Sequence, residues 1–127
     1  MAFAIGALPM EKTPMKVLVC GGRNFANKQR LFDVLDAFDH AHGIDTLIHG
    51  GARGADTLAG LWAKERGVTV WVHPADWAKH KTAAGPIRNR DMLERGQPDL
   101  VIAFAGSNGT ADMIRAAMAA GVKVQQV

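Results

Sequence analysis

Short, mostly apolar runs alternate with segments of helical periodicity along the chain, and this order restricts the fold more than any other feature. The apolar runs are residues 16–20, 45–48, 68–72, 100–104 and 122–124. The helical segments are residues 28–42, 55–66, 86–96 and 110–120. A strand as apolar as residues 16–20 is typical of a parallel sheet covered on both faces. The order predicts one α/β domain: an open parallel sheet of about five strands, right-handed crossovers, and helices on both faces.

Three glycine clusters directly follow predicted strands: Gly21-Gly22, Gly50-Gly51-Gly54 and Gly106-Gly109. The carboxyl ends of parallel strands meet at one edge of the sheet, so all three clusters are expected at that edge. Ligands of open α/β sheets bind there, near the topological switch point. The glycines are therefore candidate ligand-binding residues, and their convergence is the strongest functional indication in the residue spacing.

Residues 49–67 combine a strand end, a glycine turn and a helix start, which aims backbone N–H groups and the positive helix end at an anion. The glycines read Gly-Gly-x-x-Gly, unlike the Gly-x-Gly-x-x-Gly of dinucleotide-binding proteins, and the apolar run 68–72 lacks the acidic residue expected there. No Gly-Lys-Ser/Thr follows, as a Walker loop requires. The segment indicates a phosphate-bearing ligand without identifying it.

The composition restricts the class of protein. Its 127 residues are 48% hydrophobic and 21% charged, which argues against a disordered chain and against a membrane span. A net charge of +3 does not indicate that nucleic acid binds over the whole surface, although a local basic patch stays an alternative. The one cysteine, Cys20, suits a reducing cytoplasm. Residues 1–15 are interpreted as an unexported tail, and residues 16–127 as the domain.

Polar side chains near the glycine clusters are candidates for ligand contact. Arg23 either pairs with a phosphate or is the solvated side chain of a tight turn. Asp56 is expected to stabilise its helix end or to accept a sugar hydroxyl, in preference to acting as a general base. The hydroxyls of Ser107 and Thr110 are candidates to hold a phosphate, and Thr110 alternatively serves as a helix N-cap.

Residues 73–85 are the least regular segment and are too long for a routine connection, so they are predicted to be a functional loop. Arg88 and Asn89, at the start of the next helix, are expected to reach the ligand. Trp77 offers a flat face to a base. Other basic residues nearby are either solvated or part of a surface that binds single-stranded nucleic acid: Lys79, Lys81 and Arg90.

Cys20 and His49 carry reactive side chains close to the predicted edge. The sequence places no histidine or acid beside Cys20, so a buried thiol is preferred over a nucleophile. His49 is a candidate base, although a hydrogen-bonded structural histidine is commoner. The histidines show no metal-ligand spacing, and neither a metal nor a cofactor is predicted.

With these residues described, the chain resembles the SLOG superfamily, in particular its YspA/YpsA-related branch of small bacterial and phage proteins. The matching segments are 17–24, 50–58, 75–77, 84–90 and 98–110, which include Gly-Ala-Arg-Gly-Ala-Asp and Ala-Gly-Pro-Ile-Arg-Asn-Arg. The resemblance spans nearly all of residues 16–127. It implies a Rossmann-like three-layer fold that binds a nucleotide or nucleotide-derived ligand at the glycine edge, and a homo-oligomer, with a dimer favoured.

Distant members of the superfamily suggest two other functions. The Lonely Guy phosphoribohydrolases carry Pro-Gly-Gly-x-Gly-Thr-x-x-Glu, and the position of their essential glutamate is Met113 here. Asp112 lies one residue away, about 100° around a helix, which argues against hydrolysis of that type. The single-stranded DNA-binding protein DprA has elements resembling residues 52–54 and 88–90.

Three hypotheses follow. The leading one is a sensor or accessory module for a nucleotide-derived small molecule, whose phosphate is held by three backbone N–H groups, those of Gly22, Gly51 and Gly109. Arg23 and Arg88 neutralise it, and Asn89 or Asp56 contacts the sugar. The alternatives are a phosphoribohydrolase-like N-glycosidase acting through Asp112 or Asp56, and a single-stranded DNA-binding module.

Overall fold

Five parallel strands form one sheet in the computed structural model, which describes residues 14–127. The strands are β1 (Met15–Cys20), β2 (Ile44–His49), β3 (Thr69–Val72), β4 (Leu100–Ala103) and β5 (Lys123–Gln126). They lie in the order β3-β2-β1-β4-β5, and every neighbouring pair is parallel. The chain first builds the sheet outward from β1 on one side and then on the other. The topological switch point therefore lies between β1 and β4, and the predicted parallel α/β sheet is confirmed.

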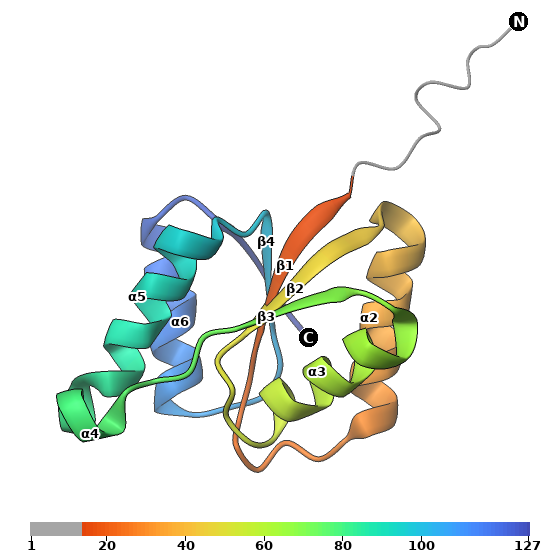
Figure 1. Ribbon diagram of the computed structural model, residues 1–127. Coiled ribbons are helices and arrows are strands. Elements are labelled where there is room, and N and C mark those ends of the chain that lie inside the picture. Colours follow the sequence, from red (N-terminus) through yellow and green to blue (C-terminus); the bar gives the residue numbers. More distant parts are fainter. Residues whose placement is uncertain (1–13) are drawn as a thin grey trace, which may run out of the picture.

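Helices cover both faces of this sheet (Figure 1). α2 (Lys28–His42) and α3 (Ala55–Arg66) pack on one face, and α5 (Ala84–Gly96) and α6 (Asn108–Ala119) pack on the other. Successive residues of β1 point into opposite cores, and Val17, Leu18 and Val19 are all fully buried. Burial on both faces is the physical reason for the unbroken apolar sequence of this strand.

Polar and glycine residues fix the ends of the first two long helices where the sequence predicts them. The Asn27 side chain caps α2 by accepting the N–H of Arg30 at 3.0 Å. Gly43 ends α2, and its N–H donates to the Asp39 carbonyl. Gly67 ends α3 in the left-handed conformation. The bounds predicted for these two helices, 28–42 and 55–66, are confirmed.

Other expectations need correction. Residues 73–85 are not a loop throughout: they contain the short helix α4 (Trp77–His80), capped by Asp76, and the 3-10 turn η1 (Lys81–Ala83). α5 then starts at Ala84, before Pro86, because proline is tolerated within the first turn of a helix. Leu61 was expected to face the core of α3 but is 36% exposed, since the smaller Ala59 and Ala63 pack against the sheet instead.

α6 also differs from the sequence prediction. It begins at Asn108 with Ser107 as its N-cap residue, so the helix starts two residues before Thr110. Ala120, expected to face inward, follows the helix and is exposed. None of the helices within residues 14–127 has both the length and the apolar character needed to cross a membrane. Most of the predicted N-terminal tail, residues 1–13, lies outside the described residues.

Candidate functional site

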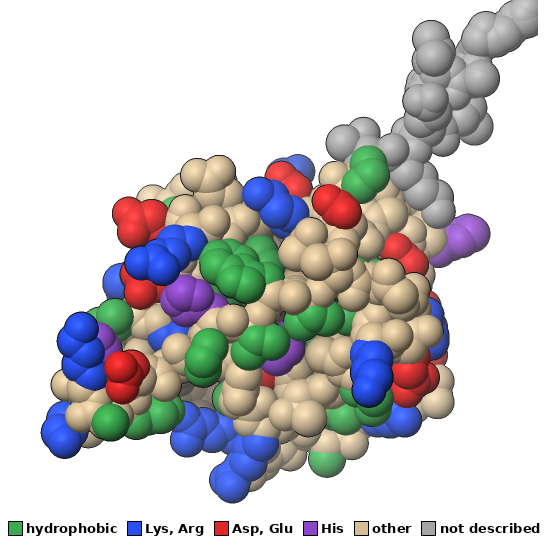
Figure 2. Space-filling view, viewed as in Figure 1, with side chains coloured by type: hydrophobic (Ala, Val, Ile, Leu, Met, Phe, Trp, Pro, Cys, Tyr) green, Lys and Arg blue, Asp and Glu red, His purple; other side chains and the backbone are tan. Residues whose placement is uncertain are grey.

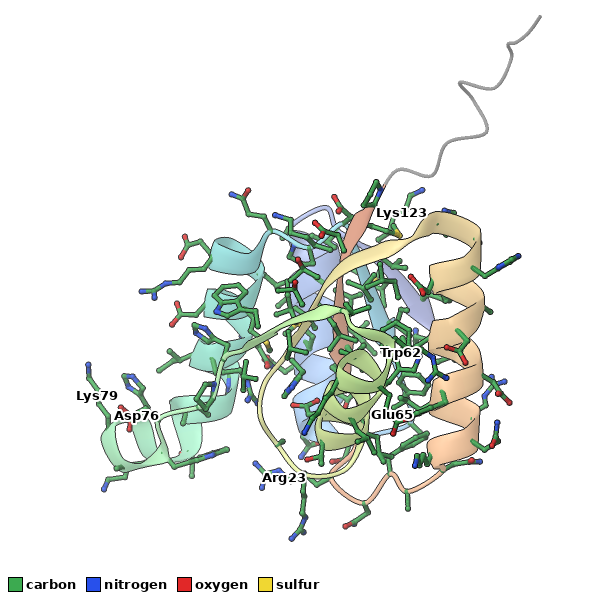
Figure 3. All side chains as sticks on the ribbon, turned by 45° about the vertical axis from the view of Figure 1, so that its right-hand side comes forward. Arg23, Trp62, Glu65, Asp76, Lys79 and Lys123 are labelled. Atoms are coloured by element: carbon green, nitrogen blue, oxygen red, sulfur yellow. The ribbon has the colours of Figure 1, made fainter. Side chains whose placement is uncertain are left out.

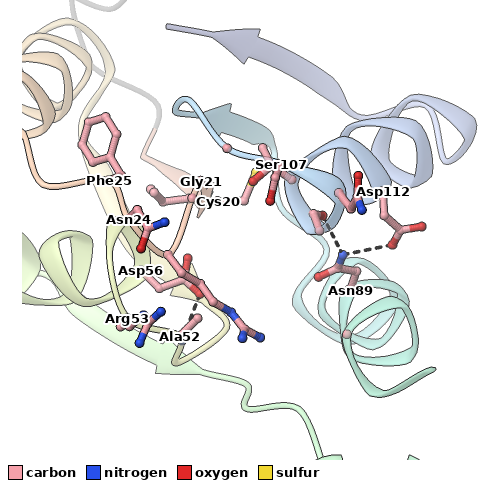
Figure 4. Close-up of a pocket in the computed structure, with 18 of the residues that line it drawn as sticks. Cys20, Gly21, Asn24, Phe25, Ala52, Arg53, Asp56, Asn89, Ser107 and Asp112 are labelled. Atoms are coloured by element: carbon pink, nitrogen blue, oxygen red, sulfur yellow. Dashed lines mark hydrogen bonds between the residues drawn. The ribbon is translucent and has the colours of Figure 1, made fainter. Parts of the chain in front are cut away.

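A cleft of about 900 Å³ opens at the carboxyl ends of β1 and β4 (Figure 4). The turns after β1 and β2 form one wall, and the turn after β4, the first turn of α6 and part of α5 form the other. This is the switch point of the sheet, where ligands of such folds bind. Its volume lies within the usual range for ligand pockets, roughly 300–1,000 Å³.

Most residues singled out from the sequence line this cleft: Gly21, Gly22, Arg23, Asp56, Trp77, Arg88, Asn89, Gly106, Ser107, Gly109, Thr110 and Asp112. Gly50 and Gly51 line a second pocket of about 460 Å³ beside it. Gly54 lines neither pocket. The structure therefore brings most of these residues together at one cleft, and the arrangement of the individual groups depends on their hydrogen bonds.

Two backbone donors expected to hold a phosphate are already paired. The N–H of Gly22 donates to the Ala105 carbonyl at 2.8 Å, which joins the turn after β1 to the turn after β4. The N–H of Gly51 donates to Nδ1 of His49 at 3.0 Å. Because each N–H hydrogen has an acceptor within the protein, neither group is free to donate to a phosphate in this structure.

Gly21 and Gly54 allow the chain to pack closely at the base of the cleft. A Cβ on Gly21 would lie 2.6 Å from Cβ of Ala55, in the first turn of α3. Gly54 has φ of 82°, and a Cβ there would run into the Gly22 carbonyl. Both glycines bring the turn after β1 against the start of α3, which is a packing role.

The first turn of α6 has unpaired donors facing the cleft. The Ser107 side chain makes no capping hydrogen bond, and within residues 14–127 no acceptor takes the N–H groups of residues 108–110. Thr110 is not the N-cap, since it lies in the third helical position and is packed with its Oγ1 against Gly106. A helix end with free N–H groups attracts an anion through both hydrogen bonding and its dipole.

Arg88 supplies a positive charge where the cleft adjoins the second pocket. Its Nη1 donates to the Gly50 carbonyl at 2.7 Å, and its Nε donates to Oδ1 of Asn89 at 3.0 Å. Its guanidinium occupies the space that a Gly50 side chain would need. Burial lowers the pKa of Arg88, the charge of Asp56 opposes that effect, and the charge of Arg23 adds to it.

The Asn89 amide joins α5 to α6. The side chain is 4% exposed, and its Nδ2 donates to the Gly109 carbonyl at 3.3 Å and to Oδ2 of Asp112 at 3.0 Å (Figure 4). Arg90 also donates to both oxygens of Asp112. Burial acts to raise the pKa of Asp112, but the hydrogen bonds from Arg90 and Asn89 outweigh it and lower the pKa. Asp112 is thus an ionised, fully engaged carboxylate.

Asp56 supports the turn after β2 and keeps one oxygen free. Its Oδ2 accepts the N–H groups of Gly50 and Ala52, at 3.0 and 3.2 Å. Its Oδ1 has no hydrogen-bond partner within residues 14–127 and is not a buried unpaired atom, so it meets the solvent in the cleft. Burial raises the pKa of Asp56, while the hydrogen bond from Ala52 and the charge of Arg88 act against that increase.

The rim of the cleft holds further basic and aromatic residues. The guanidinium carbon of Arg23 lies 5.2 Å from the centre of the Trp77 ring, and Arg53 lines the same wall. Lys79 lies at the far end of α4, away from Arg23 (Figure 3), and it does not line the cleft; neither do Lys81 and Arg90. Of the basic residues proposed to bind single-stranded DNA, only Arg88 therefore lines the cleft.

Cys20 and His49 have structural environments. Burial, followed by the charge of Asp56, raises the pKa of Cys20 to about 12, so its thiol stays protonated. His49 is 7% exposed, and burial lowers its pKa, with a smaller contribution from Arg88. A neutral His49 accepts the Gly51 N–H through Nδ1. Residues 14–127 contain no group of three or more His, Cys, Asp or Glu side chains placed to hold a metal ion.

The sequence did not single out the apolar lining of the cleft. Phe25, Pro86 and Met92 contribute to it, and the ring of Phe25 packs 5.2 Å from that of Phe104. The only available signal for Phe25 was its position shortly after Gly21-Gly22-Arg23. This lining provides a surface for the uncharged part of a ligand.

Comparisons with known proteins agree with this fold. The C-terminal domain of a Pyrococcus furiosus hydrogenase has the same fold in two crystal structures, with TM-scores of 0.56 and 0.53 and sequence identities of 17% and 20%. The alignments cover 94% of this chain in both cases, and 97% and 95% of the hydrogenase domain. The Gene 61 protein of Mycobacterium phage D29 is 37% identical over 118 residues, covering 86% of this chain and 93% of the phage protein.

Residues 15–80 match the YspA, cpYpsA-related SLOG family. This segment runs from β1 to α4 and contains the turns after β1 and β2 that form one wall of the cleft. The match extends over more than half of the chain, and the phage relative extends the similarity to most of the remainder. The chain therefore belongs to the YspA, cpYpsA-related SLOG family.

Proposed function

We propose that this protein binds a nucleotide or nucleotide-derived small molecule in the cleft between β1 and β4, as a sensor or accessory module. Membership of the SLOG family supports a nucleotide-related binding or processing role. The observation that carries the proposal is the uncapped first turn of α6, whose free N–H groups open into the same cleft as the Arg88 guanidinium. Together they make a site for a phosphate.

The sugar of the ligand fits the free oxygen of Asp56. Oδ2 of this carboxylate is engaged by Gly50 and Ala52, which fixes its orientation, while Oδ1 remains available as an acceptor. Carboxylates at this edge of Rossmann-like sheets accept ribose hydroxyls. Asn89, the other candidate for sugar contact, uses its whole amide within the protein. Asp56 is therefore the better candidate.

Two of the candidate reactive groups, Asp112 and Cys20, are poorly suited to chemistry, whereas the third, Asp56, keeps one oxygen free. Both oxygens of Asp112 are held by Arg90, and one is also held by Asn89, so this carboxylate is poorly placed to exchange a proton with a substrate. The protonated thiol of Cys20 is a weak nucleophile. These environments favour recognition over hydrolysis.

A thermal-shift screen tests the proposal. The purified protein is heated with nucleoside mono-, di- and triphosphates, NAD, ADP-ribose and a short single-stranded DNA. A ligand at 100 times its dissociation constant adds roughly 2.7 kcal/mol of stability. For a domain of this size, the midpoint is expected to rise by about 5 to 15 °C. If DNA raises the midpoint and no small nucleotide does, the proposal is contradicted and the single-stranded DNA-binding function is favoured instead.

An assay for free base separates the sensor from the enzyme. Incubation with nucleoside 5′-monophosphates is expected to release no base, because Asp112 is engaged by Arg90 and Asn89. The matched variant is Asp112→Asn. If the natural protein releases base and Asp112→Asn does not, the sensor assignment is overturned and the protein is an N-glycosidase.

A further inference from the structure

A second pocket adjoins the cleft on the side of β2 and β3. It has a volume of about 460 Å³ and is lined by residues 50–52 together with Pro74 and Ala75. Five residues line both spaces and so mark the boundary between them: Arg23, Ala52, Arg53, Trp77 and Arg88. A ligand held at α6 can therefore extend across this boundary without leaving the protein surface.

The second pocket is positively charged. Its lining holds three arginines, Arg23, Arg53 and Arg88, and no carboxylate, whereas Asp56 and Asp112 both face the larger cleft. Within residues 14–127, neither Arg23 nor Arg53 has an ion-pair partner. Basic side chains gather at the edge below the strand ends in Figure 2. Like charges converging on a concave surface repel one another, and a bound anion relieves that repulsion.

The positive charge of the second pocket affects the Arg88 side chain. The nearby positive charge of Arg23 contributes to lowering the pKa of Arg88, after the larger effect of burial. Gly50 and Gly51 allow the turn after β2 to pack closely beside the pocket, because a side chain on Gly50 would meet the Arg88 guanidinium and one on Gly51 would lie 3.1 Å from Val72. With the Gly51 N–H already paired, the guanidinium groups are the available anion-binding elements.

We infer that the second pocket binds a second anionic group of the same ligand, so the ligand is a small nucleotide whose two phosphates are set apart, as in a 5′-phosphorylated dinucleotide. This inference rests on the proposed function and specifies its ligand class. One phosphate lies at the first turn of α6 and the other lies beside Arg23 and Arg53, while Arg88, which lines both pockets, contributes charge to both positions. A mononucleotide fills only the first position.

Ala75 allows the second pocket to be changed by itself, because it lines that pocket and not the larger cleft. Ala75→Glu places a negative charge beside the second anion position, and Ala75→Gln is the uncharged control of the same size. Calorimetric titrations compare 5′-mononucleotides of the four bases with the matching 5′-phosphorylated dinucleotides. Nucleoside diphosphates, whose phosphates are contiguous, control for total charge.

The natural protein and Ala75→Gln are expected to bind the best dinucleotide at least about tenfold more tightly than its mononucleotide or diphosphate, the effect of one charge-assisted contact. Ala75→Glu is expected to lose this gain while mononucleotide affinity changes by no more than about twofold. Equal affinity for dinucleotide and mononucleotide, or an equal loss of both in Ala75→Glu, would overturn the second subsite and leave the proposed function standing.

Two further outcomes are informative. Binding of none of the nucleotides would overturn the proposed function, and the second subsite with it. A ten-nucleotide strand that binds far more tightly than the dinucleotide, with a steeper dependence on salt, would overturn the small-ligand class, because each neutralised phosphate adds to that dependence.

Discussion

Asn89 and Asp112 are joined by a hydrogen bond of 3.0 Å from Nδ2 to Oδ2, which connects α5 to the first turn of α6. Oδ1 of the same amide accepts from Arg88, and Arg88 donates to the Gly50 carbonyl on the opposite wall of the cleft. One buried amide thus takes part in a continuous chain of hydrogen bonds from the turn after β2 to α6. The amide therefore links the Arg88 side chain, which spans the cleft, to the first turn of α6.

Replacing Asn89 by leucine, a side chain of similar size, removes this connection. The free energy of unfolding is expected to fall by about 1 to 3 kcal/mol, because Arg88 and Asp112 each lose a buried partner. Urea denaturation measures the change. Gln29→Leu, on the exposed surface of α2, is the control and is expected to change stability by less than about 0.5 kcal/mol. Equal midpoints for the two variants would contradict the structural role of Asn89.

Arg88→Gln is expected to weaken ligand binding, because it removes a charge that faces the phosphate position. The loss of a charge-assisted hydrogen bond of about 1.5 to 3 kcal/mol corresponds to roughly 10- to 100-fold in affinity. Calorimetric titration with the ligand found in the thermal screen measures it. The matched control is Arg115→Gln, since Arg115 lies on α6 outside both pockets. An equal effect of both changes would place the anion elsewhere.

Two glycine substitutions are expected to act in opposite directions. Gly54→Ala introduces a Cβ that runs into the Gly22 carbonyl at a left-handed φ, so the melting temperature is expected to fall by several degrees, for a cost of about 1 to 2 kcal/mol or more. Gly109→Ala adds a methyl group to open space in the first turn of α6, so it is expected to leave stability unchanged or raise it by up to about 1 kcal/mol. Differential scanning calorimetry tests both, and equal effects would contradict the assigned roles.

Asp56→Asn is expected to change how stability depends on pH. Because burial raises the pKa of Asp56 above its ordinary 3.8, the unfolded chain releases this proton at a lower pH than the folded protein does. The natural protein therefore loses stability relative to Asp56→Asn as the pH rises from about 3.8 through the raised pKa. Urea denaturation at a series of pH values measures the difference. A difference that stays constant, or moves the other way, would contradict the raised pKa.

The fold was largely predictable because its signals are local. An asparagine before α2 and glycines after α2 and α3 mark helix ends by backbone chemistry alone, and the apolar strands reveal a sheet buried on both faces. The convergence of three glycine clusters followed from parallel strand direction. By contrast, the start of α6 was hidden because Asn108 and Gly109 are weak helix formers.

The roles within the site were not predictable, because they depend on partners distant in sequence. Nothing near Gly22 indicates that its N–H is taken by Ala105, and nothing near Arg88 indicates a bond to Gly50, 38 residues away. The inward face of α3 was also misjudged at Leu61, since the close approach of that helix to the sheet selects alanines. The dimer and the cytoplasmic location stay predictions.

The strand order β2-β1-β4 has a consequence for how the domain acquires function during synthesis. The cleft is closed by the turn after β4 and by α6, which are made long after β1 and β2. A nascent chain without its last quarter therefore lacks most of the second wall and the uncapped first turn of α6. Under the proposed function, ligand binding requires that α6 has left the ribosome and that β4 has paired with β1, so a bound ligand would protect the early and late segments of the domain from proteases together.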